Sequence, residues 1–161
     1  MAQAPETDRT KKQDLQIARS DLLDSFARAE AAIVILEEKR GLKQNTASLG
    51  LKIGRLRKLA DKDELGLDIV VLDQLTILNE IRTEIVHRPM NVVQLHGEAQ
   101  ALFVGGVEEC QLPPTARVVT LRQFKTMATD LKNLSDQIRK VATSNPPSSP
   151  PPPLPAAAGG P

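Results

Sequence analysis

An arginine and a histidine stand five positions apart near the end of one apolar segment: Arg82 and His87, in the stretch LNEIRTEIVHRP. An imidazole that titrates near neutral pH can take up or release a proton, and a guanidinium can stabilise the charge on a phosphate. Around one phosphodiester, the imidazole can accept the 2′-OH proton or protonate the leaving 5′-oxygen, while the guanidinium stabilises the phosphorane. Since DNA lacks the 2′-OH, the chemistry that this pair indicates is metal-independent cleavage of RNA.

Both side chains belong to a predicted helix that begins after Asp68, as its N-cap, and ends at about His87. Pro89 disfavours α conformation at Arg88, so the helix should stop there. The helix dipole favours a cation at this C-terminal end, whereas the positive charge of Arg82 opposes it.

Helical geometry places Arg82 on or beside the core-facing stripe, where an unpaired guanidinium would be costly. Its partner is expected to be Asn79, another helix, a second subunit or a bound anion. His87 lies about 140° further round the same helix. The two groups therefore converge only if the last turn unwinds before Pro89, or if two copies of the site meet.

A basic region precedes this helix, because residues 39–62 hold eight Lys and Arg against one Asp. Much of it falls on a predicted helix from about Leu49 to Ala60. We interpret the region either as a solvated face offset by nearby acids such as Asp63, Glu64 and Asp68, or as a patch that faces phosphate. In the second interpretation, the substrate contacts come from Arg88 beside the motif and from Lys52, Arg55, Arg57 and Lys58.

Helical patterns also flank these elements. Apolar residues three or four apart predict a long helix from Asp14 to Arg40, which Gly41 should terminate. Thr120, followed three residues later by Gln123, predicts the capped start of a last long helix. Gly50 and Gly54, spaced four apart on the basic helix, are expected to let another backbone come close.

Between the helix that carries Arg82 and His87 and the last helix, the spacing of apolar residues changes from a helical to a strand pattern. Two runs rich in Val, Leu and Phe, 91–96 and 100–104, predict a β-hairpin, and 116–119 can add a third short strand. The predicted fold class is therefore mainly α: a bundle of four to five helices with a small β-hairpin insertion between the third and last long helices.

Composition sets the domain limits. Residues 1–13 are polar, and 144–161 hold eight of the twelve prolines, so both ends are predicted to be disordered. The remaining 14–143, about 130 residues, suit one domain.

The net charge of +1 argues against the strongly basic field of a constitutive nucleic-acid binder. Cys110 is the single cysteine, which excludes an intramolecular disulfide. We expect no metal centre, no cofactor, no membrane span and a cytoplasmic location.

The segment LNEIRTEIVHRPM, in this helical context, resembles the HEPN superfamily of small all-α domains, which are found in prokaryotic toxins, abortive-infection proteins and RNA-processing factors. The resemblance implies that 14–143 is a HEPN-like domain and that Arg82 and His87 are a catalytic pair. Thr83 follows the arginine, where active members often carry Asn, Asp or His, and its hydroxyl can bond phosphate or orient His87. A homodimer with two motifs lining one cleft is also implied.

The leading hypothesis is thus a dimeric, RNA-directed endoribonuclease, as in toxin–antitoxin or abortive-infection systems, with a neutralising partner protein possible. The alternative is a non-catalytic helical module for interaction or dimerisation, in which Arg82 neutralises a buried carboxylate.

Overall fold

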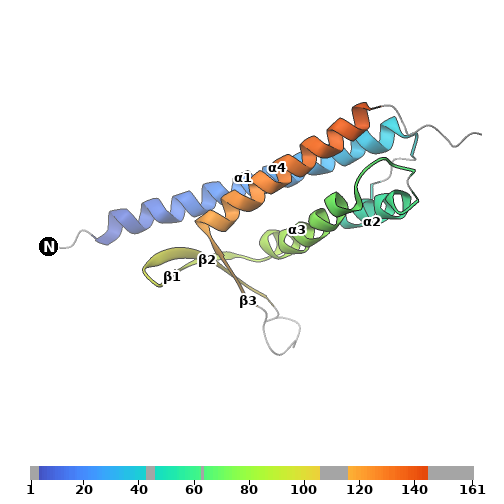
Figure 1. The fold of residues 1–161 in the computed structure, drawn as a ribbon. Helices are drawn as coiled ribbons and strands as arrows, with labels where there is room; N and C mark the ends of the chain where they lie inside the picture. Colours follow the sequence, from blue (N-terminus) through green and yellow to red (C-terminus); the bar gives the residue numbers. More distant parts are fainter. Residues whose placement is uncertain (1–3, 43–45, 63, 106–115, 145–161) are drawn as a thin grey trace, which may run out of the picture.

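The structure is a computed structural model that describes residues 4–42, 46–62, 64–105 and 116–144, and of residues 4–8 only the backbone. Within these residues, four helices and a small three-stranded antiparallel sheet make a mainly helical fold (Figure 1). The elements are α1 (Ala4–Lys39), α2 (Leu49–Ala60), α3 (Ile69–His87), β1 (Met90–Leu95), β2 (Glu98–Val104), β3 (Ala116–Thr120) and α4 (Leu121–Thr143).

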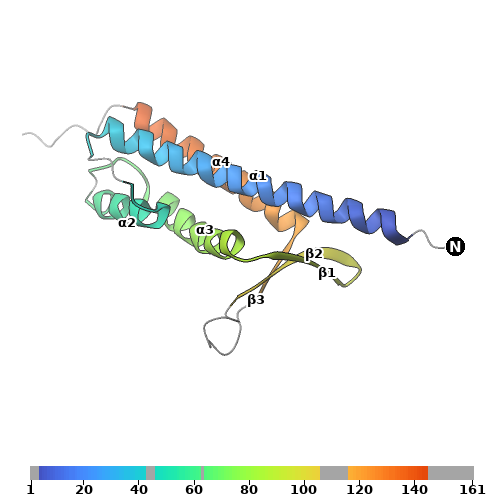
Figure 2. The same cartoon turned by 180° about the vertical axis from the view of Figure 1, so that it is seen from behind.

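The two long helices α1 and α4 run parallel to each other and form the body of the molecule (Figures 1 and 2). Their C-terminal ends are tied together, because the Arg40 guanidinium donates a hydrogen bond to the Val141 carbonyl at 3.1 Å. The shorter α3 runs in the opposite direction, and the chain returns through the sheet to the start of α4 (Figure 2). The three phenylalanines of the sequence, Phe26, Phe103 and Phe124, are all buried between these elements.

The first helix is longer than its sequence pattern predicts. It begins at Ala4, so residues 4–13, which the polar composition predicts to be disordered, form its first turns. This stretch has no glycine, and Pro5 falls in the first turn, where a missing N–H removes no helical hydrogen bond. At the other end, Gly41 adopts a φ of +65°, and the Leu42 N–H donates to the Glu37 carbonyl, as a glycine-terminated helix requires.

The helix that carries the motif has the predicted limits. The Asp68 carboxylate accepts a hydrogen bond from the Val70 N–H at 2.9 Å and caps the start of α3. The helix then stays regular to His87, and Arg88 is extended, with φ −115° and ψ 143°, as a residue before proline should be. The motif therefore occupies the last two turns of an intact helix.

The predicted hairpin is present and has a third strand, in the order β1-β2-β3. The connection between β1 and β2 is only two residues, His96 and Gly97, which both have positive φ (52° and 79°). Such a pair matches the right-handed twist of a tight hairpin. His96 is exposed in this turn.

The two faces of the sheet differ in how they are covered. Ala101, Phe103 and Val119 point to the inner face and are buried against the helices. The opposite face carries apolar side chains that do not pack on the core of the described residues: Val93, Leu95, Leu102, Val104 and Val118.

The Thr120–Gln123 capping box predicted at the start of α4 is present, with hydrogen bonds of 2.8 and 3.1 Å.

Two predicted features lie outside the described residues: Cys110, and the Pro-rich tail apart from Ser144. Over the described ranges, no helix has both the length and the apolar character needed to cross a bilayer. In the same ranges, no three His, Cys, Asp or Glu side chains gather as metal ligands.

Candidate functional site

Arg82 lies on the core-facing side of α3, as its position in the helix predicts. The carbon at the centre of its guanidinium is 5.9 Å from the centroid of the Phe26 ring on α1. This cation–π contact is the partner expected from another helix. Among the described residues, no carboxylate forms an ion pair with Arg82. Its hydrogen-bond donors are therefore not committed to an acid of the described chain.

His87 is the last residue of α3 and is exposed. Because the helix keeps its regular form to this residue, the imidazole leaves α3 about 140° away from Arg82. The unwinding of the last turn that would bring the two groups together does not occur. Within one chain, the structure does not unite the predicted pair.

Thr83 is exposed and lies one turn before His87, so the two side chains share one face of α3. The Thr83 hydroxyl donates a hydrogen bond to the Asn79 carbonyl, four residues earlier, at 3.1 Å. The hydroxyl oxygen keeps its acceptor capacity for a neighbouring donor such as the imidazole.

A carboxylate on the same turn of α3, Glu84, pairs with an arginine of the sheet. Glu84, three residues before His87, forms an ion pair with Arg117 on β3, whose second nitrogen lies 3.3 Å from the other carboxylate oxygen. Arg88 approaches the same carboxylate at 4.0 Å. The hydrogen bond from Arg117 lowers the pKa of the Glu84 carboxyl below its ordinary value; burial opposes this effect, and the positive charges of Arg117 and Arg88 add to it.

Two further residues position this cluster. The Arg19 guanidinium on α1 donates to the Ile85 carbonyl, in the last turn of α3, at 2.7 Å, and also lies 5.9 Å from the Phe103 ring. A cation at a helix C-terminus is favourable for the helix dipole. The Arg88 side chain passes directly over the backbone of Gly105, where a β-carbon would collide with its guanidinium. Neither Arg19 nor Arg117 stands out in the sequence, since each meets α3 only through the tertiary fold.

The predicted basic surface on α2 is largely neutralised. Lys52 is buried and pairs with Glu30 at 2.8 Å. Arg55 pairs with Glu37, which is only 1% exposed, and Arg57 pairs with an acid on α3, Asp73, at 3.0 Å.

Of the predicted substrate residues on α2, Lys58 is exposed and has no ion pair among the described residues. Among the described residues, the acids that pair with this region are Glu30, Glu37 and Asp73. Of the neighbouring acids expected from the sequence, Glu64 and Asp68 form no ion pair with it there, and Asp63 lies outside the described residues.

The two glycines of α2 do not admit a second backbone. A β-carbon at Gly50 would meet the Asn79 side-chain amide at 3.2 Å, and one at Gly54 would meet nothing within 4 Å. The close backbone approach predicted from their spacing is not observed among the described residues.

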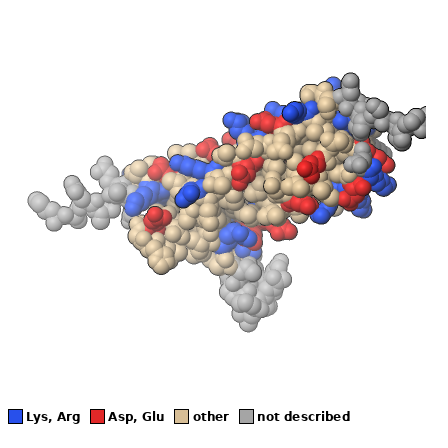
Figure 3. All heavy atoms as spheres, viewed as in Figure 1, with Lys and Arg blue, Asp and Glu red and all other residues tan. Residues whose placement is uncertain are grey.

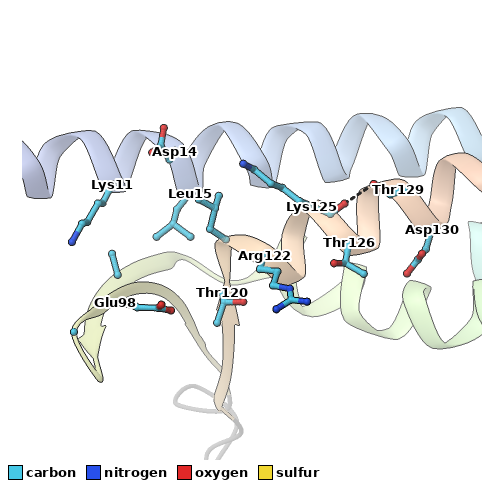
Figure 4. Close-up of a pocket in the computed structure, with 13 residues that line it drawn as sticks. Lys11, Asp14, Leu15, Glu98, Thr120, Arg122, Lys125, Thr126, Thr129 and Asp130 are labelled. Carbon is cyan, nitrogen blue, oxygen red and sulfur yellow. Dashed lines mark hydrogen bonds between the residues drawn. The ribbon is translucent and has the colours of Figure 1, made fainter.

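A separate cavity of about 840 Å³ lies between α1, the turn of the hairpin and the first turns of α4 (Figure 4). Lys11 and Leu15 reach it from α1, Glu98 from the hairpin, and Thr120 from the end of β3. Its lining includes three cationic and three acidic side chains: Lys11, Arg122, Lys125, Asp14, Glu98 and Asp130. No predicted site residue lines it, and the balanced charges favour neither an anionic nor a cationic ligand.

Basic and acidic atoms are interspersed over the face of the molecule seen in Figure 3, which agrees with the net charge of +1.

Comparisons of the chain with family models, with curated proteins and with solved structures found no match.

Proposed function

We propose that the protein is a HEPN-like, metal-independent endoribonuclease that acts as a homodimer. One observation carries the proposal: α3 presents an exposed imidazole at its end and, on another face, a guanidinium that no acid of the described chain neutralises. Within one chain the two groups are too divergent for one phosphodiester. The composite site therefore takes Arg82 from one copy and His87 from the other.

In the proposed reaction, the 2′-oxygen of a ribose attacks the adjacent phosphorus, and His87 accepts the 2′-OH proton. The P–O5′ bond then breaks, and a proton is returned to the leaving 5′-oxygen. Arg82 stabilises the charge that develops on the phosphorane. The products are a 2′,3′-cyclic phosphate and a 5′-hydroxyl, and no step requires a metal ion or a cofactor.

The test is cleavage of single-stranded RNA in EDTA, with analysis of the ends. Wild-type protein should leave 2′,3′-cyclic phosphates. His87→Ala and Arg82→Ala should each lower the rate by at least about 100-fold, the usual contribution of such groups. Lys132→Ala, which removes an exposed cation from α4, should cleave normally. Equal cleavage by the wild type and both motif variants would identify a contaminating nuclease and end the proposal.

A cytoplasmic location and a neutralising partner protein belong to the same proposal, since an active ribonuclease would have to be restrained where cellular RNA is present. The test is co-expression of the wild type with the product of a neighbouring gene. That product should relieve the toxicity of the wild type, and His87→Ala should not be toxic even without it. This result would support the partner.

The outer face of the sheet favours a second candidate function, a non-catalytic module through which two copies associate. Leu95 and Val118 are 38% and 40% exposed there, among further apolar side chains. Apart from Glu98 at its hairpin end, this face is formed by apolar and uncharged side chains, and such a face can pack against its own copy.

Sedimentation measurements test this candidate. Val118→Lys should convert a wild-type dimer to a monomer, whereas Leu51→Lys, a matched change at a 69% exposed leucine on α2, should leave it dimeric. A dimer that persists in Val118→Lys would exclude the sheet face, and RNA cleavage that depends on His87 would exclude the non-catalytic function.

A further inference from the structure

Three arginines from three different elements meet at the C-terminal end of α3. Arg19 comes from α1, Arg88 follows α3 directly, and Arg117 comes from β3. Glu84 is the carboxylate that pairs with Arg88 and Arg117 there. Glu80, one turn earlier on α3, also acts electrostatically on Arg117. These five side chains carry three positive charges and two negative charges, a net of +1.

We infer that Arg88 and Arg117 form a binding site for a phosphate of the RNA backbone, and that Glu84 holds the two guanidinium groups in position until the phosphate replaces it. This inference rests on the proposed function for its ligand and extends it to residues outside the Arg82–His87 pair.

The geometry fits a phosphate in place of the carboxylate. Glu84 receives two nitrogens of Arg117 on its two oxygens, the fork arrangement that a guanidinium also offers to phosphate. Arg88 and Arg117 are 22% and 38% exposed, so both guanidinium groups are accessible from solvent. The carboxylate itself can rotate away on a flexible side chain.

The distance to the catalytic histidine is also suitable. Glu84 and His87 are three residues apart on a regular helix, so their β-carbons are about 5–6 Å from each other. A phosphate held at the Glu84 position is then one helical turn from the imidazole. The next phosphodiester of the same strand can reach His87 while the first is anchored.

Gly105 gives this site a steric determinant. The Arg88 guanidinium passes where a β-carbon of residue 105 would be, so Gly105→Ala must displace the far end of that flexible side chain. The arginine would still be present, with its charge unchanged. Gly54→Ala is the matched control, because a β-carbon there meets nothing within 4 Å.

The test measures binding of a fluorescent 2′-O-methyl single-stranded RNA, which lacks the attacking 2′-OH and is not cleaved, at several salt concentrations. Arg117→Ala and Arg88→Ala should each weaken binding and reduce the slope of log K against log salt by about 0.7, the value for one lost phosphate contact on a single strand. Gly105→Ala should weaken binding and Gly54→Ala should not.

The sharpest comparison is Glu84→Gln with Asp73→Asn. Each removes one negative charge from a carboxylate that pairs with arginine, so each changes the net charge equally. Glu84→Gln should tighten binding by about three- to tenfold, because it removes the negative charge that competes with the phosphate for Arg117. Asp73→Asn should have a much smaller effect. Equal tightening by the two variants, or an unchanged affinity in Arg117→Ala, would overturn the inference.

Two controls keep the outcome clear. If Arg117→Ala does not fold, the double variant Glu84→Gln/Arg117→Gln removes both partners of the ion pair and should still bind more weakly than Glu84→Gln alone. Binding without any cleavage of unmodified RNA would contradict the proposed catalysis and leave the phosphate site standing. Cleavage with unaltered binding in all Arg88 and Arg117 variants would contradict the site alone.

Discussion

Arg82 and His87 leave the same helix about 140° apart, because α3 remains regular up to the residue before Arg88. This relationship decides how the motif can work. If the two groups act on one phosphodiester, they must come from different copies of the chain. Replacing Arg82 or His87 should then reduce RNA cleavage much more than it reduces the stability of the fold.

Arg82→Met should separate these two properties. The methionine keeps much of the apolar stem, and the lost contact is a cation–π interaction with Phe26 rather than an ion pair in the described chain. The free energy of unfolding should fall by only about 1 kcal/mol, while RNA cleavage should be lost. Urea denaturation and cleavage of the same preparation measure both. A loss of several kcal/mol would instead make Arg82 a structural residue, as the alternative hypothesis holds.

The Glu84–Arg117 pair predicts a pH-dependent stability. The pKa of Glu84 is lowered in the folded protein, chiefly by the hydrogen bond from Arg117. Its contribution is therefore complete above the ordinary value of 4.5 and is lost as the pH falls through the lower folded pKa. Arg117 stays charged throughout this range, and its own pKa is raised by the same hydrogen bond.

Wild type should accordingly exceed Glu84→Gln in stability by about 1 kcal/mol at pH 7, a modest value because both partners are partly exposed. The difference should shrink towards zero in acid. Denaturation of both proteins between pH 2 and pH 7 measures it, and a difference that grows as the pH falls would contradict the assignment.

The α2 cations that form ion pairs should prove structural rather than substrate-binding. Arg55→Ala leaves the buried Glu37 without this partner, which should cost about 3 kcal/mol. The double variant Arg55→Met/Glu37→Leu should recover most of that loss, since it removes both charges. Lys58→Ala should change stability by less than about 0.5 kcal/mol. If Arg55→Ala is as stable as the wild type but binds RNA poorly, the phosphate-facing interpretation of α2 is correct.

Local signals in the sequence predict much of this fold. The limits of α2, the Asp68 cap of α3, the glycine end of α1 and the Thr120–Gln123 capping box all depend on residues within a few positions of one another. The hairpin is likewise predicted by its two apolar runs. The start of α1 is missed because polar helix-forming residues resemble a disordered end when no apolar stripe accompanies them.

The site is less predictable, because its partners are distant in the sequence. Phe26 meets Arg82 across 56 positions (82 − 26), and Arg117 meets Glu84 across 33. No periodicity or short motif carries such pairings. The same reason explains α2, where Glu30 and Glu37 neutralise cations of another helix that lies one loop further along the chain.

Complementation between two inactive variants tests the composite site most directly. Arg82→Ala and His87→Ala are mixed in equal amounts, unfolded and refolded together so that chains exchange, and assayed on RNA. Half of the dimers should be mixed, each with one intact site, so about a quarter of the wild-type activity should return. Each variant refolded alone should stay inactive. No recovery in a mixture that contains mixed dimers would contradict a site shared between two copies.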